Sequence, residues 1–218
     1  MRLYLLQKSE RGTPVPPQRW NDRVLPEASV RLASCVIADC RLTGALWKQW
    51  SRQMGLENSA QLSVIADGAA WIWEQARQRL SPHASWCVDV YHVSEHLHRC
   101  GREMLGETEQ ARSWAQSELE ELIRVGGPGY LAGLDEQIRA TSRAGSREAL
   151  QTLRVYLEGN KDRMWYAQRL QEGKPIGSGA IEGACKKIGS RLKLNSARWR
   201  PRRAERFGAL LCLEYTDQ

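Results

Sequence analysis

The chain has 218 residues, enough for one domain with a large insertion and a proper hydrophobic core. No apolar run reaches the roughly 18 residues of a membrane span, and the N-terminal apolar patch is too short for a secretory signal, so composition argues against both classes. The net charge is +7, and the six cysteines form no CxxC pair, which favours reduced thiols in a cytoplasm over a disulfide framework.

The first part of the chain alternates between strand and helix patterns. Short apolar or alternating runs predict strands, and apolar residues at helical spacing predict helices. The Pro-rich segment Gly12–Pro26 is expected to be a long loop. Alternating strands and helices favour right-handed crossovers and a sheet with parallel members. The expected strands are Val30–Ala38, Leu62–Ala66 and Trp86–Val90, and the expected helices are Leu42–Met54, Ala69–Leu80 and a segment from Tyr91 onward.

The middle of the chain shows helix patterns only. Helix-forming residues with charged faces run from Glu103 to Glu158, interrupted by the sequence GGPG at 126–129. No strand is expected up to Glu172, because neither alternation nor β-branched runs occur there. We therefore predict an all-helical insertion over residues 101–172, following a partial α/β core over residues 1–100.

The last part, residues 173–218, is helical and basic. A loop at 173–179 precedes a helix with Ser178 as its N-cap, and Pro201 permits a last helix over Arg202–Glu214. The segment from Lys186 to Arg206, called the basic segment below, holds nine Lys or Arg and one acid. It therefore carries +8, and the rest of the chain sums to −1. Such a localised charge is typical of a polyanion partner, although a solvated helix face is an equally good interpretation.

Acidic residues occur at the ends of two expected strands. Asp67 directly follows Leu62–Ala66, and Asp89 lies at the end of the next strand, with His92 shortly after. Open α/β sheets bind ligands at the carboxyl ends of their strands, so both acids are expected on one rim. The competing interpretations are an Asp67 that caps the following helix and a surface Asp89–His92 pair at a helix start.

A third acid, Glu182, falls in the first two turns of the helix after Ser178. Lys186 and Arg191 follow it, so one helix would carry a metal-ligand acid and then phosphate-binding cations. Carboxylates that hold Mg²⁺ support phosphodiester hydrolysis, because the ions activate the nucleophile and neutralise the leaving oxygen. An acid favoured by the helix dipole is the simpler interpretation of Glu182 until other acids converge on it.

Three segments in series resemble the ordered motifs of the ISKra-type insertion-sequence transposases, which are similar to the wider Mutator-like group. The three are ADGAAWIW (66–73), DVYHVSEHL (89–97) and PIGSGAIEGACK (175–186). The intervening LEGNKDRM (157–164) resembles that family's sequence too. The resemblance extends from about residue 57 to 210, and the order of the motifs makes it specific.

The resemblance implies an RNase H-like mixed sheet, with the helical insertion before the last catalytic helix. It implies that Asp67 and Glu182 are the second and third acids of a triad that binds Mg²⁺ or Mn²⁺, so the two should approach closely enough to share a metal. Asp89 and His92 match a D-x-x-H signature and would position the metal-bound water or support the metal ligands. The implied activity is DNA strand cleavage and 3′-end transfer at transposon ends, by a homo-oligomer on double-stranded DNA in the bacterial cytoplasm, associated with the nucleoid.

The first acid of such a triad has no counterpart in this chain. If Leu62–Asp67 is the fourth strand of the fold, Val30–Ala38 is the third and residues 1–8 the second, so no first strand remains. Asp39 then lies at the sheet edge, and Asp22 lies in the Pro-rich loop. We therefore expect an N-terminally truncated fold, with the first acid upstream of Met1. The alternative function is an inactive remnant that binds DNA without catalysis.

Two other enzymatic arrangements are weaker. His92, His96 and Cys100 share one helical stripe and could bind Zn²⁺, although packing of the histidine and cysteine side chains against the core is the better interpretation. Cys87 and His92 could form a nucleophile and base, but nothing supplies an oxyanion hole.

The basic segment holds the expected DNA contacts. Trp199, between two arginines, could stack on an unpaired base or anchor the last helix, and both interpretations stand. The expected DNA-binding residues are Lys186, Lys187, Arg191, Lys193, Arg198, Trp199, Arg200, Arg202 and Arg203.

Overall fold

The computed structural model describes residues 2–216 except 58, 60 and 194–197, and only the backbone of 2–6, 180 and 182. The strands are β1 (Arg2–Lys8), β2 (Val30–Val36), β3 (Ser63–Ala66) and β4 (Ser85–Val88). The helices are α1 (Cys40–Gln53), α2 (Ala70–Arg79), α3 (Val90–Leu105), α4 (Glu109–Ala140), α5 (Ala144–Glu158), α6 (Tyr166–Gln171), α7 (Gly179–Leu192) and α8 (Pro201–Cys212), with 3₁₀ turns η1 (Pro17–Asp22), η2 (Lys161–Arg163) and η3 (Leu213–Tyr215).

The expected order of strands and helices up to α3 is confirmed, with element ends within two residues of the prediction. The Pro-rich segment differs, because it contains η1 instead of being loop throughout. Its Trp20 is buried and its ring lies 6.4 Å from that of Tyr91, so a distant contact stabilises this turn. Pro17 at the first turn position also favours it, since its ring fixes φ and no N–H is lost there.

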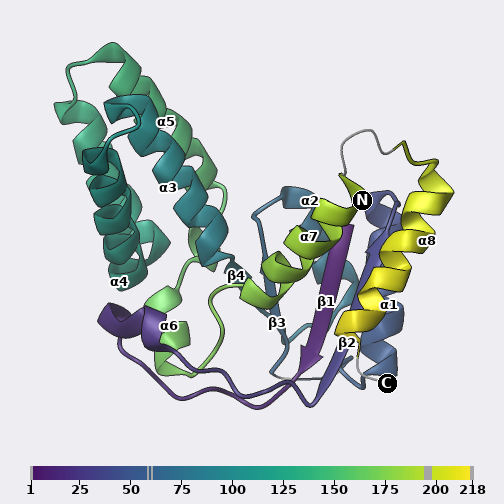
Figure 1. Ribbon diagram of the computed structural model, residues 1–218. Coiled ribbons are helices and arrows are strands. Elements are labelled where there is room, and N and C mark those ends of the chain that lie inside the picture. The colour runs from purple at the N-terminus through teal and green to yellow at the C-terminus, as the bar shows by residue number, and fades with distance from the viewer. Residues whose placement is uncertain (1, 58, 60, 194–197, 217–218) are drawn as a thin grey trace.

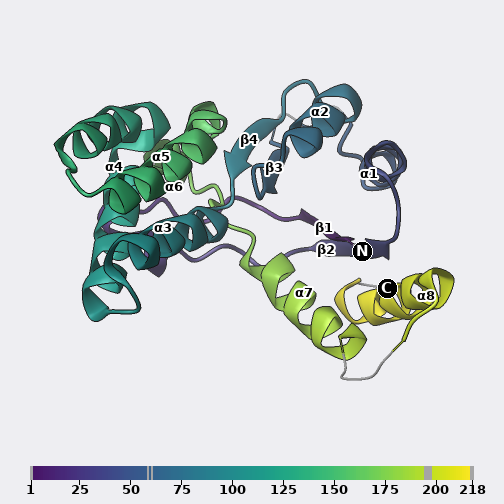
Figure 2. The same ribbon diagram turned by 90° about the horizontal axis from the view of Figure 1, so that it is seen from above.

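The strands form two separate sheets, whereas we expected one mixed sheet. β1 pairs with β2 in antiparallel fashion from Arg2–Val36 to Lys8–Val30, and β3 pairs with β4 in parallel fashion from Ser63–Ser85 to Ala66–Val88. Among the described residues, β1 and β3 therefore each have one edge that no strand covers. These two edges lie on the sides of the sheets that face each other (Figures 1 and 2).

Helices cover both sides of the strands. Figure 2 shows α1 and α2 on one side and α7 and α8 on the other. A small apolar cluster, with Cys35 of β2 and Leu211 of α8 among its members, joins the second pair of helices to the β1–β2 sheet. Because α7 and α8 pack on this sheet, the basic segment is attached to folded structure.

The helices α3, α4 and α5 pack together beside the sheets and are called the helical region below (Figure 1). α3 belongs to it, although its residues up to 100 lie within the expected core unit. The structure contains no strand from Glu103 to Glu172, as predicted. The GGPG sequence does interrupt α4, since Gly126 has φ 75° and ψ 171°. No helix in the described chain is long and apolar enough to cross a bilayer.

Candidate functional site

Asp67 directly follows β3, in a turn that leads into α2. Gly68 has φ +93°, a conformation that side-chain-bearing residues rarely adopt, and lets the backbone turn at once. One carboxylate oxygen of Asp67, Oδ1, accepts a hydrogen bond of 3.0 Å from the amide of Ala69. Ala69 is the N-cap residue of α2 and no side chain caps this helix, so Asp67 closes the turn before α2 instead of capping the helix. The side chain is nevertheless exposed, and a carboxylate offers about four acceptor positions, so this bond leaves room for a ligand.

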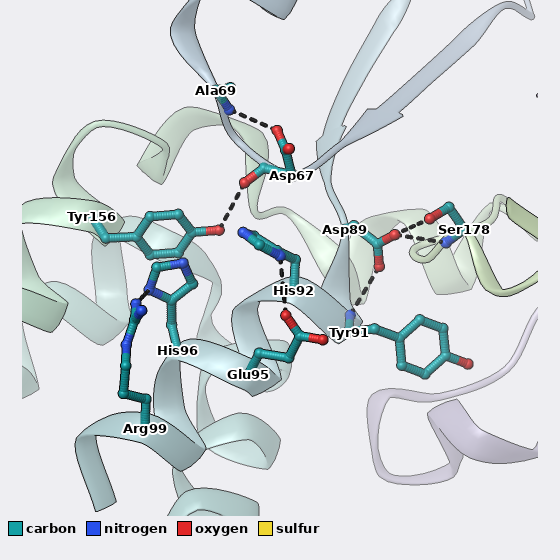
Figure 3. Close-up of polar contacts among 10 residues, drawn as sticks. All are labelled: Asp67, Ala69, Asp89, Tyr91, His92, Glu95, His96, Arg99, Tyr156 and Ser178. Carbon is teal, nitrogen blue, oxygen red and sulfur yellow. Dashed lines mark hydrogen bonds and ion pairs between the residues drawn. The ribbon is translucent and has the colours of Figure 1, made fainter. Parts of the chain in front are cut away.

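Asp89 joins the starts of α3 and α7 (Figure 3). Its Oδ1 accepts the amide of Tyr91 at 2.9 Å, while Oδ2 accepts the amide of Ser178 at 3.1 Å and also its hydroxyl. Asp89 is 8% exposed, so it is not part of a surface pair. Ser178 does occupy the N-cap position of α7, as expected, but its hydroxyl bonds to Asp89 instead of capping the helix.

His92 and His96 lie one turn apart on α3, with ring centroids 5.0 Å apart. His92 Nδ1 lies 3.3 Å from Glu95 Oε2. The guanidinium of Arg99 donates to His96 Nδ1 at 2.5 Å. Burial, together with the charges of Arg99 and His92, lowers the pKa of His96 to about 4, so this imidazole is neutral at pH 7.

Tyr156 of α5 contacts both His96 and the turn after β3, and the sequence pattern indicated no role for it. Its ring stacks on His96 with centroids 3.6 Å apart and planes at 7°, and its hydroxyl donates to the backbone carbonyl of Asp67 at 3.3 Å (Figure 3). Burial and the nearby Asp67 and Asp89 raise the pKa of Tyr156, so its hydroxyl keeps its proton.

Asn160 is the second residue for which the sequence pattern indicated no role. It is 5% exposed, and its Nδ2 donates to the Tyr156 carbonyl at 3.0 Å. A Cβ on Gly68 would lie 2.9–3.2 Å from the Asn160 amide group, so the two residues are in close contact. The one sequence signal near it was the LEGNKDRM segment, whose resemblance implied no role for any of its residues.

Glu182 lies within α7, but its side chain is outside the part that the structure describes. The expected approach of Glu182 to Asp67 therefore stays a prediction. Asp39 caps α1 through the Leu42 amide at 2.7 Å, and Asp22 pairs with Arg19 at 2.8 Å, so both have local structural roles.

The described side chains form no complete metal site. No group of three or more His, Cys, Asp or Glu within the described residues is placed to hold a metal. Asp89 already accepts bonds from three donors, whereas Asp67 is exposed at a strand end. Mg²⁺ is often held by one or two carboxylates with water and substrate phosphates, so the exposed Asp67 carboxylate has the chemistry of such a ligand.

The zinc and thiol alternatives do not fit. Cys100 is buried in the core, where burial raises the pKa of its thiol to about 12, and His96 is engaged by Arg99 and Tyr156. Packing of Cys100 against the core is thus confirmed. Burial likewise raises the pKa of the Cys87 thiol to about 12, so it stays protonated and cannot serve as a nucleophile.

The basic segment spans the end of α7, the start of α8 and the connection between them. The arginines 198, 200, 202, 203 and 206 are exposed, and Arg191 pairs with Glu214 at 3.2 Å. Trp199 stacks on Phe207 with centroids 5.1 Å apart, and its Nε1 donates to the Leu192 carbonyl at 2.9 Å. These contacts favour the helix-anchoring interpretation of Trp199 over base stacking.

Comparisons with protein-family models, with curated proteins and with solved structures find no match to this chain.

Proposed function

We propose that this chain is the C-terminal portion of an insertion-sequence DNA transposase, whose intact form cuts a DNA strand and transfers its 3′ end. One observation carries the proposal. Asp67 and Asp89 follow neighbouring parallel strands, and Ser178 donates a hydrogen bond to Asp89. The three motif segments therefore converge at the carboxyl ends of β3 and β4. Residues that are far apart in sequence but converge at strand ends are typical of a ligand site in an open α/β fold.

The proposed site uses Asp67 and Glu182 as metal ligands. Bound Mg²⁺ or Mn²⁺ would supply activation of the attacking hydroxyl and stabilisation of the leaving oxygen. Asp89 acts by fixing the start of α7, the helix to which Glu182 belongs, and His92 lies beside it on α3. The exposed arginines of the basic segment would bind the phosphates of double-stranded DNA.

We further propose that the two sheets are halves of one RNase H-like sheet. The free edges of β1 and β3 support this, because one added strand could satisfy both. A strand that lies between these two edges and is joined to β1 by a hairpin would run antiparallel to β1. It would also bring the first acid next to Asp67.

The alternative is a remnant that binds DNA without catalysis. It is supported by the exposed arginines of the basic segment, which can bind DNA phosphates without a metal site. In this case the basic segment would remain functional and Asp67 would serve only to cap its turn.

A nicking assay on a substrate with transposon ends distinguishes the two. The 218-residue chain is expected to leave DNA uncut with Mg²⁺ or Mn²⁺, whereas a chain extended upstream through a strand ending in Asp is expected to nick it. Asp67→Asn in the extended chain should abolish nicking, and Asp39→Asn, an exposed helix cap, should leave it intact. If the 218-residue chain nicks DNA and loses this activity on Asp67→Asn, the proposal that a further strand supplies the first acid is wrong. Failure of every genomic extension to nick would favour the remnant.

A further inference from the structure

The turn after β3 is held from outside its own sheet. The carbonyl of Asp67 accepts the hydroxyl of Tyr156, and Gly68 packs against the side chain of Asn160. Both partners belong to the chain segment that ends α5 and leads into η2, 89 positions beyond Asp67 in the first case. The helical region therefore contacts the very residues that aim the Asp67 carboxylate.

The two holding residues are themselves fixed. The Tyr156 ring lies flat on the His96 ring, and Arg99 donates to His96 Nδ1. The tyrosine of α5 is therefore fixed against α3. Asn160 donates to the Tyr156 carbonyl, which ties the two residues to each other. The Asn160 Oδ1 atom is buried and accepts no hydrogen bond within the described residues, so this polar side chain is retained at a cost.

We propose that Tyr156 and Asn160 are positioning residues for Asp67. They hold the Asp67–Gly68 turn against the helical region and thereby set the direction of the Asp67 carboxylate. The proposal rests on the proposed function for what that carboxylate does, while the hold itself depends only on the contacts above.

The amide of Ala69 reports on this hold, because it donates to Asp67 Oδ1. In the 218-residue protein, we expect Tyr156→Phe and Asn160→Ala to speed hydrogen exchange of the Ala69 amide by a factor of about 2 to 10, the range for removal of one net hydrogen bond. Tyr130→Phe is the control, since it removes the hydroxyl of another tyrosine of the helical region, one that donates to Glu118 at 2.5 Å. An unchanged Ala69 rate in both variants, or an equal increase in Tyr130→Phe, would overturn the proposal.

Binding of Mn²⁺ alone separates this inference from the proposed function. If Asp67 is a metal ligand, Mn²⁺ should broaden the amide signals of residues 67–69, and Asp67→Asn should remove the effect. Tyr156→Phe and Asn160→Ala should then weaken Mn²⁺ binding by roughly tenfold, as removal of a group that orients a metal ligand does. Accelerated exchange without any Mn²⁺ effect in the wild type would reject the metal role and keep the hold. Mn²⁺ binding that neither variant weakens would reject the positioning role.

Discussion

Asp89 illustrates how one buried carboxylate can organise two helices. Replacement by Asn places an amide N–H₂ group where at least one of the three donors from Tyr91 and Ser178 now finds an oxygen. We expect Asp89→Asn to lower the free energy of unfolding by about 1–3 kcal/mol, the cost of a buried donor without an acceptor. Urea denaturation followed by circular dichroism measures the change.

Asp39→Asn serves as the control for this substitution. Asp39 caps α1 in the same way but is exposed. Asn and Asp are about equally good N-caps, so the change should stay within roughly 0.5 kcal/mol. Equal losses of stability in the two variants would mean that the bonds to Ser178 contribute nothing beyond capping.

His96 should make stability depend on pH. Its folded-state pKa of about 4 lies below the ordinary value of 6.5, so between these limits the unfolded chain binds a proton that the folded chain does not. The stabilisation is complete above pH 6.5 and is lost as the pH falls toward 4. From pH 7 to pH 5 the wild type should lose about 1–2 kcal/mol more unfolding free energy than His96→Phe, which keeps a ring for Tyr156. Urea titrations at the two pH values measure these losses. Equal losses in the wild type and in His96→Phe would exclude His96 as the source of the pH dependence.

At the level of whole elements, the glycine next to the break in α4 is a packing requirement. A Cβ on Gly127 would lie 2.4 Å from the Lys161 carbonyl oxygen, so the glycine allows α4 to contact η2. Gly127→Ala should lower the free energy of unfolding by about 1–3 kcal/mol through overpacking. Gly133→Ala in the same helix meets open space and should raise it by about 0.5–1 kcal/mol. Thermal unfolding of both variants tests the opposite signs, and a shared sign would mean that contact with η2 does not require the glycine.

Local patterns predicted the elements well and their partners poorly. The spacing of apolar residues reports which face of a segment is buried, so the order β2, α1, β3, α2, β4, α3 could be predicted. The turn η1 could not, because it depends on burial of Trp20 against Tyr91. Local patterns likewise identified Asp67 and Asp89, which follow predicted strands, but they gave no role to Tyr156 and Asn160. Their contacts depend on how the helical region folds back, which no local spacing encodes.

At the scale of the molecule, the charge is unevenly distributed. The basic segment carries +8 and sits on α7 and α8, while the helical region stands at the opposite end (Figure 1). A DNA duplex approaching this protein should therefore meet the α7–α8 end first, and its binding should fall steeply with salt as counterions are released.

Substitution of four arginines tests this orientation. Changing Arg198, Arg200, Arg202 and Arg203 to Ala should weaken binding to DNA of any sequence, and should flatten the log–log salt slope by about 0.9 for each phosphate that the protein no longer neutralises. The control changes four exposed arginines of the helical region, Arg112, Arg124, Arg139 and Arg147. Fluorescence anisotropy across a salt series measures both. Affinity and slope that survive the first set of changes would make the basic segment a solvated face.

The backbone hydrogen bond between Val90 and Ile176 has a consequence for how such a protein can evolve. The chain leaves the end of β4 at Val90 and returns to it at Ile176, whose carbonyl accepts a hydrogen bond from the Val90 amide at 3.0 Å. An excursion whose ends meet can lengthen or shorten at little cost, because loop-closure entropy changes only logarithmically with length. Tyr156 and Asn160 limit this freedom, since they belong to the excursion yet touch the turn after β3. Natural variants should therefore differ most in the distal ends of α4 and α5 and least where the excursion meets the sheet.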